Sequence, residues 1–322
     1  MRIRTTAILL SFYLLASTSS LPAPYVWKNG WFHDQKYVAT ESLEDHWKKG
    51  LQSLANKDWD EAFLQFRTVS LSFPDSSQAK EAHYYTGIAL FNLDDFDIAN
   101  KEFSQYLELE NNPQFYEEVF QYKLLIAQKL KDGAFRRAFG YESMPKIMPA
   151  KDLALEIFEE VATSLPNHDL AATALQEKAS MLLEREEFDQ AIDTYQTLIR
   201  RFPKSQFAIA GYLGVAQAYL KQIELEGNNP DPLPLAELNL QKFQADFPQE
   251  AALEAASGTL NQMQEIAANG LFDIGQFYER TKRPSASIIY YKMAITRFPT
   301  TEVAKLCQER LKELEVDETN SS

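Results

Sequence analysis

Cysteine and glycine are both scarce in this chain of 322 residues. Because Cys307 is the one cysteine, no internal disulfide can form, and a packed core must stabilise the fold. Cys307 shares a helical stripe with apolar side chains, so we expect it to be a buried small residue. The 11 glycines, against 21 phenylalanines and 15 tyrosines, favour helices over sheets that are rich in turns.

Positive charge is the next shortage. The chain has 32 lysines and arginines against 46 aspartates and glutamates, which gives a formal net charge of -14. Proteins that bind nucleic acid need clustered cations opposite the phosphates, so we expect no nucleic-acid partner. An acidic surface suits solubility, or protein partners with basic faces.

Catalytic signatures are absent from the sequence as well. It contains no GxSxG, HExxH, P-loop or CxxC motif. The four histidines stand apart, without helical ligand spacing to one another. Acidic runs such as residues 184–187 are typical of solvated helix ends. We therefore expect a protein that is not an enzyme and holds no cofactor or metal ion.

The N-terminus has the layout of a secretory signal peptide. Arg2 and Arg4 precede an apolar stretch from Ala7 to Ala16, and small residues follow. This stretch is too short to cross a bilayer of ~30 Å as a helix. We predict a signal peptide at residues 1–20 and export of the protein, with an uncleaved anchor as the alternative.

Residues 21–42 form an extension that is rich in aromatic side chains. It precedes the first predicted helix and contains a glycine between aromatics, which suggests a short turn. We interpret this extension as padding for the exposed end of the helices that follow. An anchor for a partner is the alternative.

One spacing recurs along the rest of the chain: a small residue, a bulky residue four positions later, and a proline eight positions beyond. Its first instance is Ala62, Phe66 and Pro74. The small residues of the other instances are Ala154, Ala191, Ala236 and Ser287, and Ala99 with Phe103 continues the pattern. The small residue lets two helices approach, the bulky one packs on the same face, and the proline ends the helix.

This spacing is that of the second helix of a tetratricopeptide unit. It predicts an all-α fold, a tetratricopeptide-like superhelical array of about six helix pairs that begins near Leu43. We place two N-terminal units at residues 43–131, an inserted loop at 132–149, and further units with a long helical insert at 150–315. We expect residues 316–322 to be a disordered tail.

The sequence FPxSxxAxxA, which follows several helix pairs, resembles the BamD family of outer-membrane assembly proteins. The last third is the closest part, where Ile274, Gly275, Phe277 and Tyr278 stand in a run like that of the family's last unit. The resemblance implies a periplasmic adaptor, peripheral to the outer membrane. Its implied partners are the outer-membrane barrel-assembly protein and unfolded outer-membrane protein precursors.

Two features separate this chain from that family. BamD proteins are lipoproteins, but the predicted signal has no lipobox cysteine, so we expect membrane association through partners. The chain also has at least one more repeat than the usual five. CpoB/YbgF-like envelope coordinators share the FPxSxxA signature and are the alternative, as is another tetratricopeptide interaction module. The insert after Pro248 favours the BamD-like interpretation.

Two sets of residues are candidate sites. First helices line the concave face of such arrays, which predicts an apolar groove for an extended peptide. The groove residues are Trp47, Leu51, Tyr84, Ile88 and Phe91. Packing on the neighbouring unit is the alternative for each of them.

The second set is a basic patch in an acidic protein, formed by Arg280, Lys282 and Arg283. The resemblance implies that the C-terminal units dock the barrel-assembly protein, and these cations would meet carboxylates there. A solvated turn is the alternative interpretation.

Overall fold

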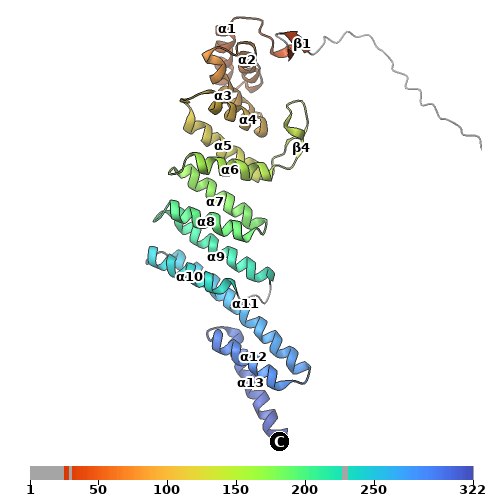
Figure 1. Ribbon diagram of the computed structural model, residues 1–322, viewed down its shortest axis with the longest axis vertical. Coiled ribbons are helices and arrows are strands. Elements are labelled where there is room, and N and C mark those ends of the chain that lie inside the picture. Colours follow the sequence, from red (N-terminus) through yellow and green to blue (C-terminus); the bar gives the residue numbers. More distant parts are fainter. Residues whose placement is uncertain (1–24, 29–30, 227–230, 322) are drawn as a thin grey trace, which may run out of the picture. The chain divides into compact units, whose positions relative to one another are not determined.

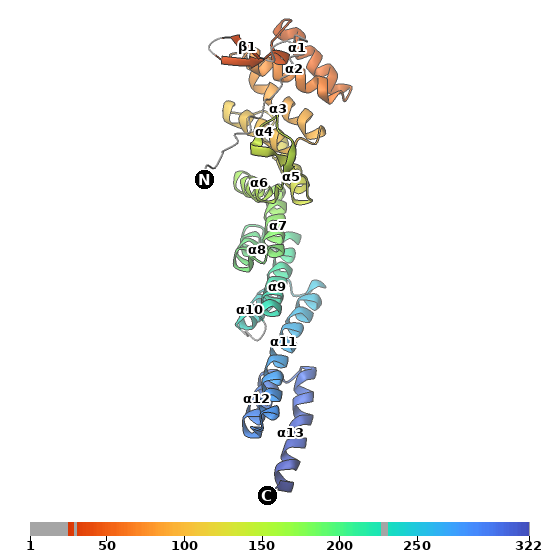
Figure 2. The same cartoon turned by 90° about the vertical axis from the view of Figure 1, so that its right-hand side faces the viewer.

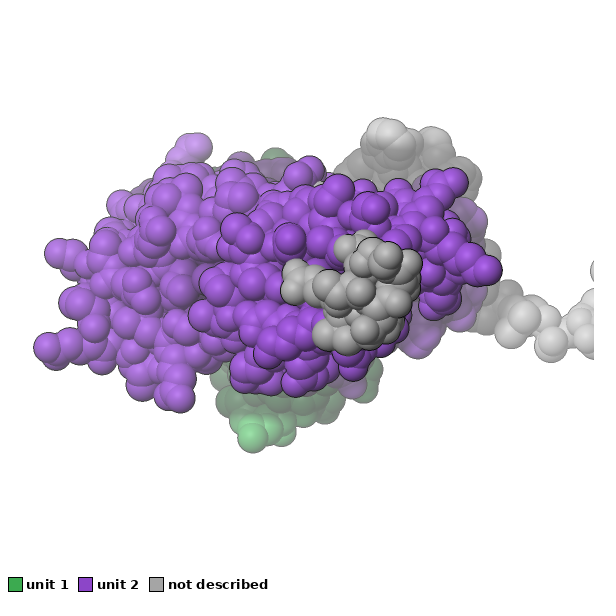
Figure 3. Space-filling model, turned by 90° about the horizontal axis from the view of Figure 1, so that it is seen from below, with its two compact units in different colours: residues 1–93 green, residues 94–322 purple. Residues whose placement is uncertain are grey.

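The computed structural model describes residues 25–28, 31–226 and 231–321, and the predicted signal peptide lies outside them. The described residues divide into two compact units, with the boundary between residues 93 and 94 (Figure 3). They contain thirteen α-helices and four short strands, so the all-α, tetratricopeptide-like fold is confirmed.

The first unit begins with two short antiparallel strands, β1 (Tyr25–Lys28) and β2 (Trp31–Asp34). The short helix η1 (Gln35–Tyr37) follows them. The α-helices of the first unit are α1 (Leu43–Ala55), α2 (Trp59–Ser72) and α3 (Ser77–Asn92). Buried Tyr37 meets the ring of Phe63 edge-on, with 6.0 Å between ring centroids, so the end of the extension packs on α2.

The second unit holds the remaining helices (Figures 1 and 2). They are α4 (Phe96–Leu109), α5 (Tyr116–Lys131), α6 (Lys151–Ser164), α7 (Asp169–Glu184), α8 (Phe188–Arg201), α9 (Gln206–Glu226), α10 (Pro232–Asp246), α11 (Ala252–Arg280), α12 (Pro284–Arg297) and α13 (Glu302–Ser321). Consecutive helices pack as pairs in this unit: α5 with α6, α7 with α8, α9 with α10, and α11 with α12. In the first unit α1 and α2 pack in the same way.

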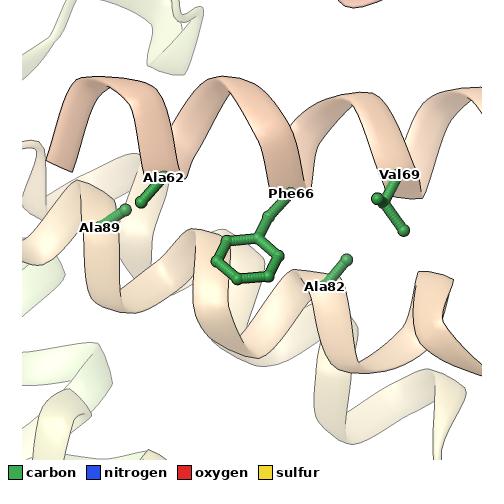
Figure 4. Packing of buried hydrophobic residues seen from close by; sticks show 5 residues of the cluster. All are labelled: Ala62, Phe66, Val69, Ala82 and Ala89. Atoms are coloured by element: carbon green, nitrogen blue, oxygen red, sulfur yellow. The ribbon is translucent and has the colours of Figure 1, made fainter. Parts of the chain in front are cut away.

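Small and bulky residues meet as the sequence spacing predicts. In the first unit Phe66 is fully buried among Ala62, Ala82, Ala89 and Val69 (Figure 4). A methyl group at Gly50 of α1 would lie 2.9 Å from the Phe66 ring, so only glycine lets this ring approach without rearrangement. Gly275 of α11 stands in the same relation to buried Tyr291 of α12, at 2.4 Å.

The inserted loop corrects one predicted boundary. It lies inside the third helix pair, between α5 and α6, and not between the second and third units. Residues 43–131 therefore hold five helices, two pairs and the first helix of the third. The loop is a hairpin of β3 (Arg136–Arg137), the short helix η2 (Ala138–Gly140) and β4 (Lys146–Met148).

Two other segments refine the predictions. The insert after Pro248 lengthens α11, which runs for 29 residues without a break. It packs against α9 and α10 and also against α12 and α13. The segment predicted to be a disordered tail is helical up to Ser321, because its polar residues extend α13 without a glycine or proline to end it.

Candidate protein-interaction surfaces

The predicted groove of the first unit is more buried than a peptide site requires. Tyr84 and Ile88 are 7% and 9% exposed. Trp47 is half-buried and meets the rings of Phe66 and Tyr85 edge-on, at 5.4 and 5.5 Å between centroids. This burial and these ring contacts favour the packing alternative for the three residues, and the peptide groove stays a prediction.

Two residues of that set keep accessible surface. Leu51 is exposed on α1, and Phe91 is half-buried on α3. The sequence could not separate them from the others, because a first helix turns its apolar side chains partly toward its neighbours and partly toward solvent.

The predicted basic patch lies at the turn between α11 and α12. Arg280 ends α11, Arg283 is the N-cap residue of α12, and Lys282 has a left-handed backbone with φ of 58°. All three side chains are exposed, and within the described part of the chain none has an ion-pair partner. Phe277, one turn before Arg280, is 53% exposed. The turn thus presents unpaired cations beside an apolar ring.

A groove that the sequence did not predict lies between α8 and α10, with α9 as its floor. It consists of two cavities of about 280 and 340 Å³, which share Gln196, Tyr219 and Leu235. Buried Tyr212 and Val215 lie at its floor.

Leu235 and Leu238 of α10 line the groove and are about half exposed. The groove runs along α8 from Asp189 to Arg200, which corresponds to ~16 Å at 1.5 Å per residue.

The two ends of this groove carry opposite charges. Asp189, Asp193 and Asp231 line one end. Arg200 and Lys242 line the other. Tyr212 donates a hydrogen bond of 2.6 Å to Asp246, and burial raises the pKa of its hydroxyl. The floor is thus fixed, while the apolar walls and charged ends face outward.

The most buried charge belongs to the helix packing. The Lys123 ammonium of α5 donates to Asn100 at 3.0 Å, Ser104 at 2.7 Å and Glu160 at 2.9 Å, and burial lowers its pKa. Cys307 is buried, as predicted, and burial raises its pKa to about 11. Among the described residues no group of acidic, histidine or cysteine side chains could hold a metal ion. None of the described helices has the length and apolar content that crossing a membrane requires.

Comparison with known proteins shows the family of this chain. The model of the YfiO family, described as "Outer membrane lipoprotein", matches residues 40–208, just over half of the chain. The chain belongs to the YfiO family. This membership confirms the BamD-like resemblance, although the sequence resemblance drew most on the last third, which lies beyond the matched residues.

Solved structures similar to this YfiO-family chain include three described as tetratricopeptide repeat proteins. One from Bacteroides fragilis has a TM-score of 0.41 and 11% identity, covering 85% of this chain and 100% of that one. One from Parabacteroides merdae has a TM-score of 0.36 and 12% identity, covering 85% and 98%. The C-terminal part of one from Cytophaga hutchinsonii has a TM-score of 0.32 and 13% identity, covering 83% and 99%. A search of the curated proteins found no match.

Proposed function

We propose that this protein is a non-enzymatic adaptor in outer-membrane protein assembly. It is exported to the periplasm, binds unfolded β-barrel precursors and docks on the barrel-assembly protein at the outer membrane. Membership of a family of outer membrane lipoproteins supports the location, and the tetratricopeptide fold supports a role in protein–protein interaction. The CpoB/YbgF-like alternative stays open, and the partner captured below distinguishes the two.

The groove between α8 and α10 is the observation that supports the proposed binding of unfolded precursors, the clients of this adaptor. Strands of transmembrane barrels alternate apolar and polar side chains, so an unfolded precursor presents an apolar side chain at every second position. A groove of ~16 Å accommodates about five residues of extended chain. Leu235, Leu238 and the floor at Val215 would take the apolar side chains, and the polar ones would face solvent.

A crosslinking experiment tests this site. A photoactivatable side chain at Leu238 should capture unfolded barrel precursors during export. The same group at Leu225 of α9, which is 59% exposed and lies outside the groove, is the matched control. The same photoactivatable group at positions 51 and 91 tests the two accessible residues of the predicted N-terminal groove. Equal capture at positions 238 and 225, or capture of Tol-system or cell-wall proteins alone, would reject client binding in this groove.

Docking on the barrel-assembly protein is assigned to the turn between α11 and α12. Exposed cations without ion-pair partners steer association toward an acidic partner surface and set its register. Arg280 and Arg283 are the residues to change, because Lys282 has a left-handed backbone that a new side chain could disturb.

The double change Arg280→Glu and Arg283→Glu should slow association at low salt. The effect should shrink as salt rises, because screening acts over ~10 Å at 0.1 M. A control pair, Lys48→Glu and Lys221→Glu, alters the net charge equally at exposed helix positions away from this turn. If both pairs slow association to the same degree, net charge and not this turn governs the encounter.

A further inference from the structure

The hairpin between α5 and α6 is fixed firmly at its base. The Arg137 guanidinium contacts both carboxylate oxygens of Asp95, with its Nε at 2.8 and 3.0 Å, and its backbone amide donates to Asp97 at 3.1 Å. Both aspartates are buried at the start of α4. Lys146 donates to the Asp94 carbonyl at 2.8 Å. These charged contacts hold the hairpin against α4.

The tip of the same hairpin is apolar and open to solvent. Figure 1 shows the hairpin standing out beside the helices α4 to α6 of its unit. Its large exposed side chains are Phe135 at 54%, Phe139 at 80%, Tyr141 at 65%, Met144 at 39% and Ile147 at 63%. An exposed group of this size marks an interaction site, because isolated chains rarely leave so many large apolar side chains together in water.

Phe139 adds a second indication. Its backbone is left-handed, with φ of 55°, which is unfavourable for a bulky residue. Strained residues persist where the surroundings fix them, and they cluster at functional positions. Packing of the Phe139 ring does not explain this conformation, because four-fifths of the side chain is exposed.

Charge is distributed along the hairpin in a matching order. Residues 132–152 contain four cations, Arg136, Arg137, Lys146 and Lys151, and three carboxylates, Asp132, Glu142 and Asp152. Asp95 pairs with Arg137 and Lys146, whereas Arg136 and Lys151 have no ion-pair partner among the described residues. Arg136, Arg137 and Lys146 lie on the strands at the base. The apolar Phe139, Tyr141 and Met144 lie between the two strands.

We propose that this hairpin inserts its tip into the boundary between headgroups and acyl chains of a phospholipid membrane. Aromatic side chains favour that boundary, and basic side chains just behind them lie at the depth of the phosphates. Arg136 and Lys151, which pair with no carboxylate among the described residues, complement phosphate groups, and anionic lipids most of all. A protein pocket would explain the apolar tip but not these two cations behind it. The inference goes beyond the proposed function, in which partners alone bring the protein to the membrane.

Purified vesicles test the proposal without any protein partner. The full mature chain should co-sediment with vesicles of phosphatidylethanolamine and phosphatidylglycerol, and more weakly with phosphatidylcholine alone. Phe139→Ser combined with Tyr141→Ser should lower the partition coefficient at least ten-fold, because the transfer free energy of one such ring alone corresponds to roughly a ten-fold change. Leu109→Ser combined with Leu225→Ser is the control, because both leucines are exposed elsewhere in the unit.

A second reporter locates the tip. Phe139→Trp adds a fifth tryptophan, and its emission is the difference between the spectra of the variant and the unaltered chain. When vesicles are added, this emission should shift to the blue and be quenched by quenchers in the acyl chains. Absence of vesicle binding by the unaltered chain, or equal losses in the hairpin and control pairs, would overturn the proposal. A third outcome would also overturn it: the hairpin pair loses binding to the assembly protein, and vesicles leave the Phe139→Trp emission unchanged. The hairpin would then be a protein-docking surface. Failure of the groove crosslinks leaves this test unaffected.

Discussion

Gly214 of α9 lies directly against the ring of Tyr195 from α8. A methyl group at this position would stand 2.4, 2.5 and 2.6 Å from three atoms of the ring. No real side chain tolerates such distances, and the ring is only 6% exposed, so it has little room to retreat. Gly214→Ala is therefore a stringent test of the small-and-bulky pairing that builds the fold.

Two effects oppose each other in this substitution. Alanine favours the helix by ~1 kcal/mol relative to glycine. Overpacking a buried contact costs ~1–3 kcal/mol, and three sub-van-der-Waals distances point to the upper end. We expect Gly214→Ala to lower the free energy of unfolding by about 1–2 kcal/mol.

Urea unfolding followed by circular dichroism measures this change. Gly258→Ala in α11 is the matched control, because nothing lies within 4 Å of the added methyl group there. It should stabilise the protein by up to ~1 kcal/mol. Tyr195→Leu combined with Gly214→Ala should recover part of the loss, because it removes the ring that clashes. If Gly214→Ala stabilises as much as Gly258→Ala does, the close approach of α8 and α9 is wrong.

Three further outcomes follow from buried groups. Ala191→Leu should cost ~1–3 kcal/mol, because Ala191 is fully buried between paired helices; a change within error in the unfolding midpoint would disprove the register. Glu160→Ala should destabilise more than Lys123→Met, since the first leaves the Lys123 ammonium buried without its carboxylate; urea midpoints in the reverse order would contradict this. Burial raises the pKa of Cys307 from 9.0 to about 11, so the unfolded state loses this proton first, and stability falls as pH rises between these values. Cys307→Ala should flatten that part of the pH profile, and an unchanged slope would speak against the burial.

The helix pairs could be predicted because their spacing is local. Gly50 and Phe66, or Gly275 and Tyr291, lie sixteen residues apart, so one register carries both the helices and the turn between them. The third helix pair, α5 and α6, does not follow this local spacing. Twelve positions before Ala154 is Glu142, inside the hairpin, so the insertion hid α5 as the first helix of that pair.

The surfaces could be predicted less well, because they depend on which neighbours share a face. The sequence predicted the basic turn at Arg280 correctly as an exposed turn, because a turn between two paired helices lies at the surface. Burial of Tyr84 depends on tertiary packing, which an amphipathic pattern does not specify. The groove between α8 and α10 draws residues from three helices, and Asp193 or Lys242 alone is indistinguishable from a solvated helix residue.

The continuous helix α11 has a consequence for how the C-terminal end unfolds. Its 29 residues span ~43 Å, and its two parts belong to different neighbours, α9 and α10 on one side and α12 and α13 on the other. In ordinary repeat proteins a terminal unit can fray while its neighbour stays folded, because a loop separates them. Here no loop intervenes, so the last helices detach only if α11 breaks within a regular turn. A pull on α13 would load the helices next to the groove, and the end that we assign to docking is mechanically linked to the site that we assign to clients.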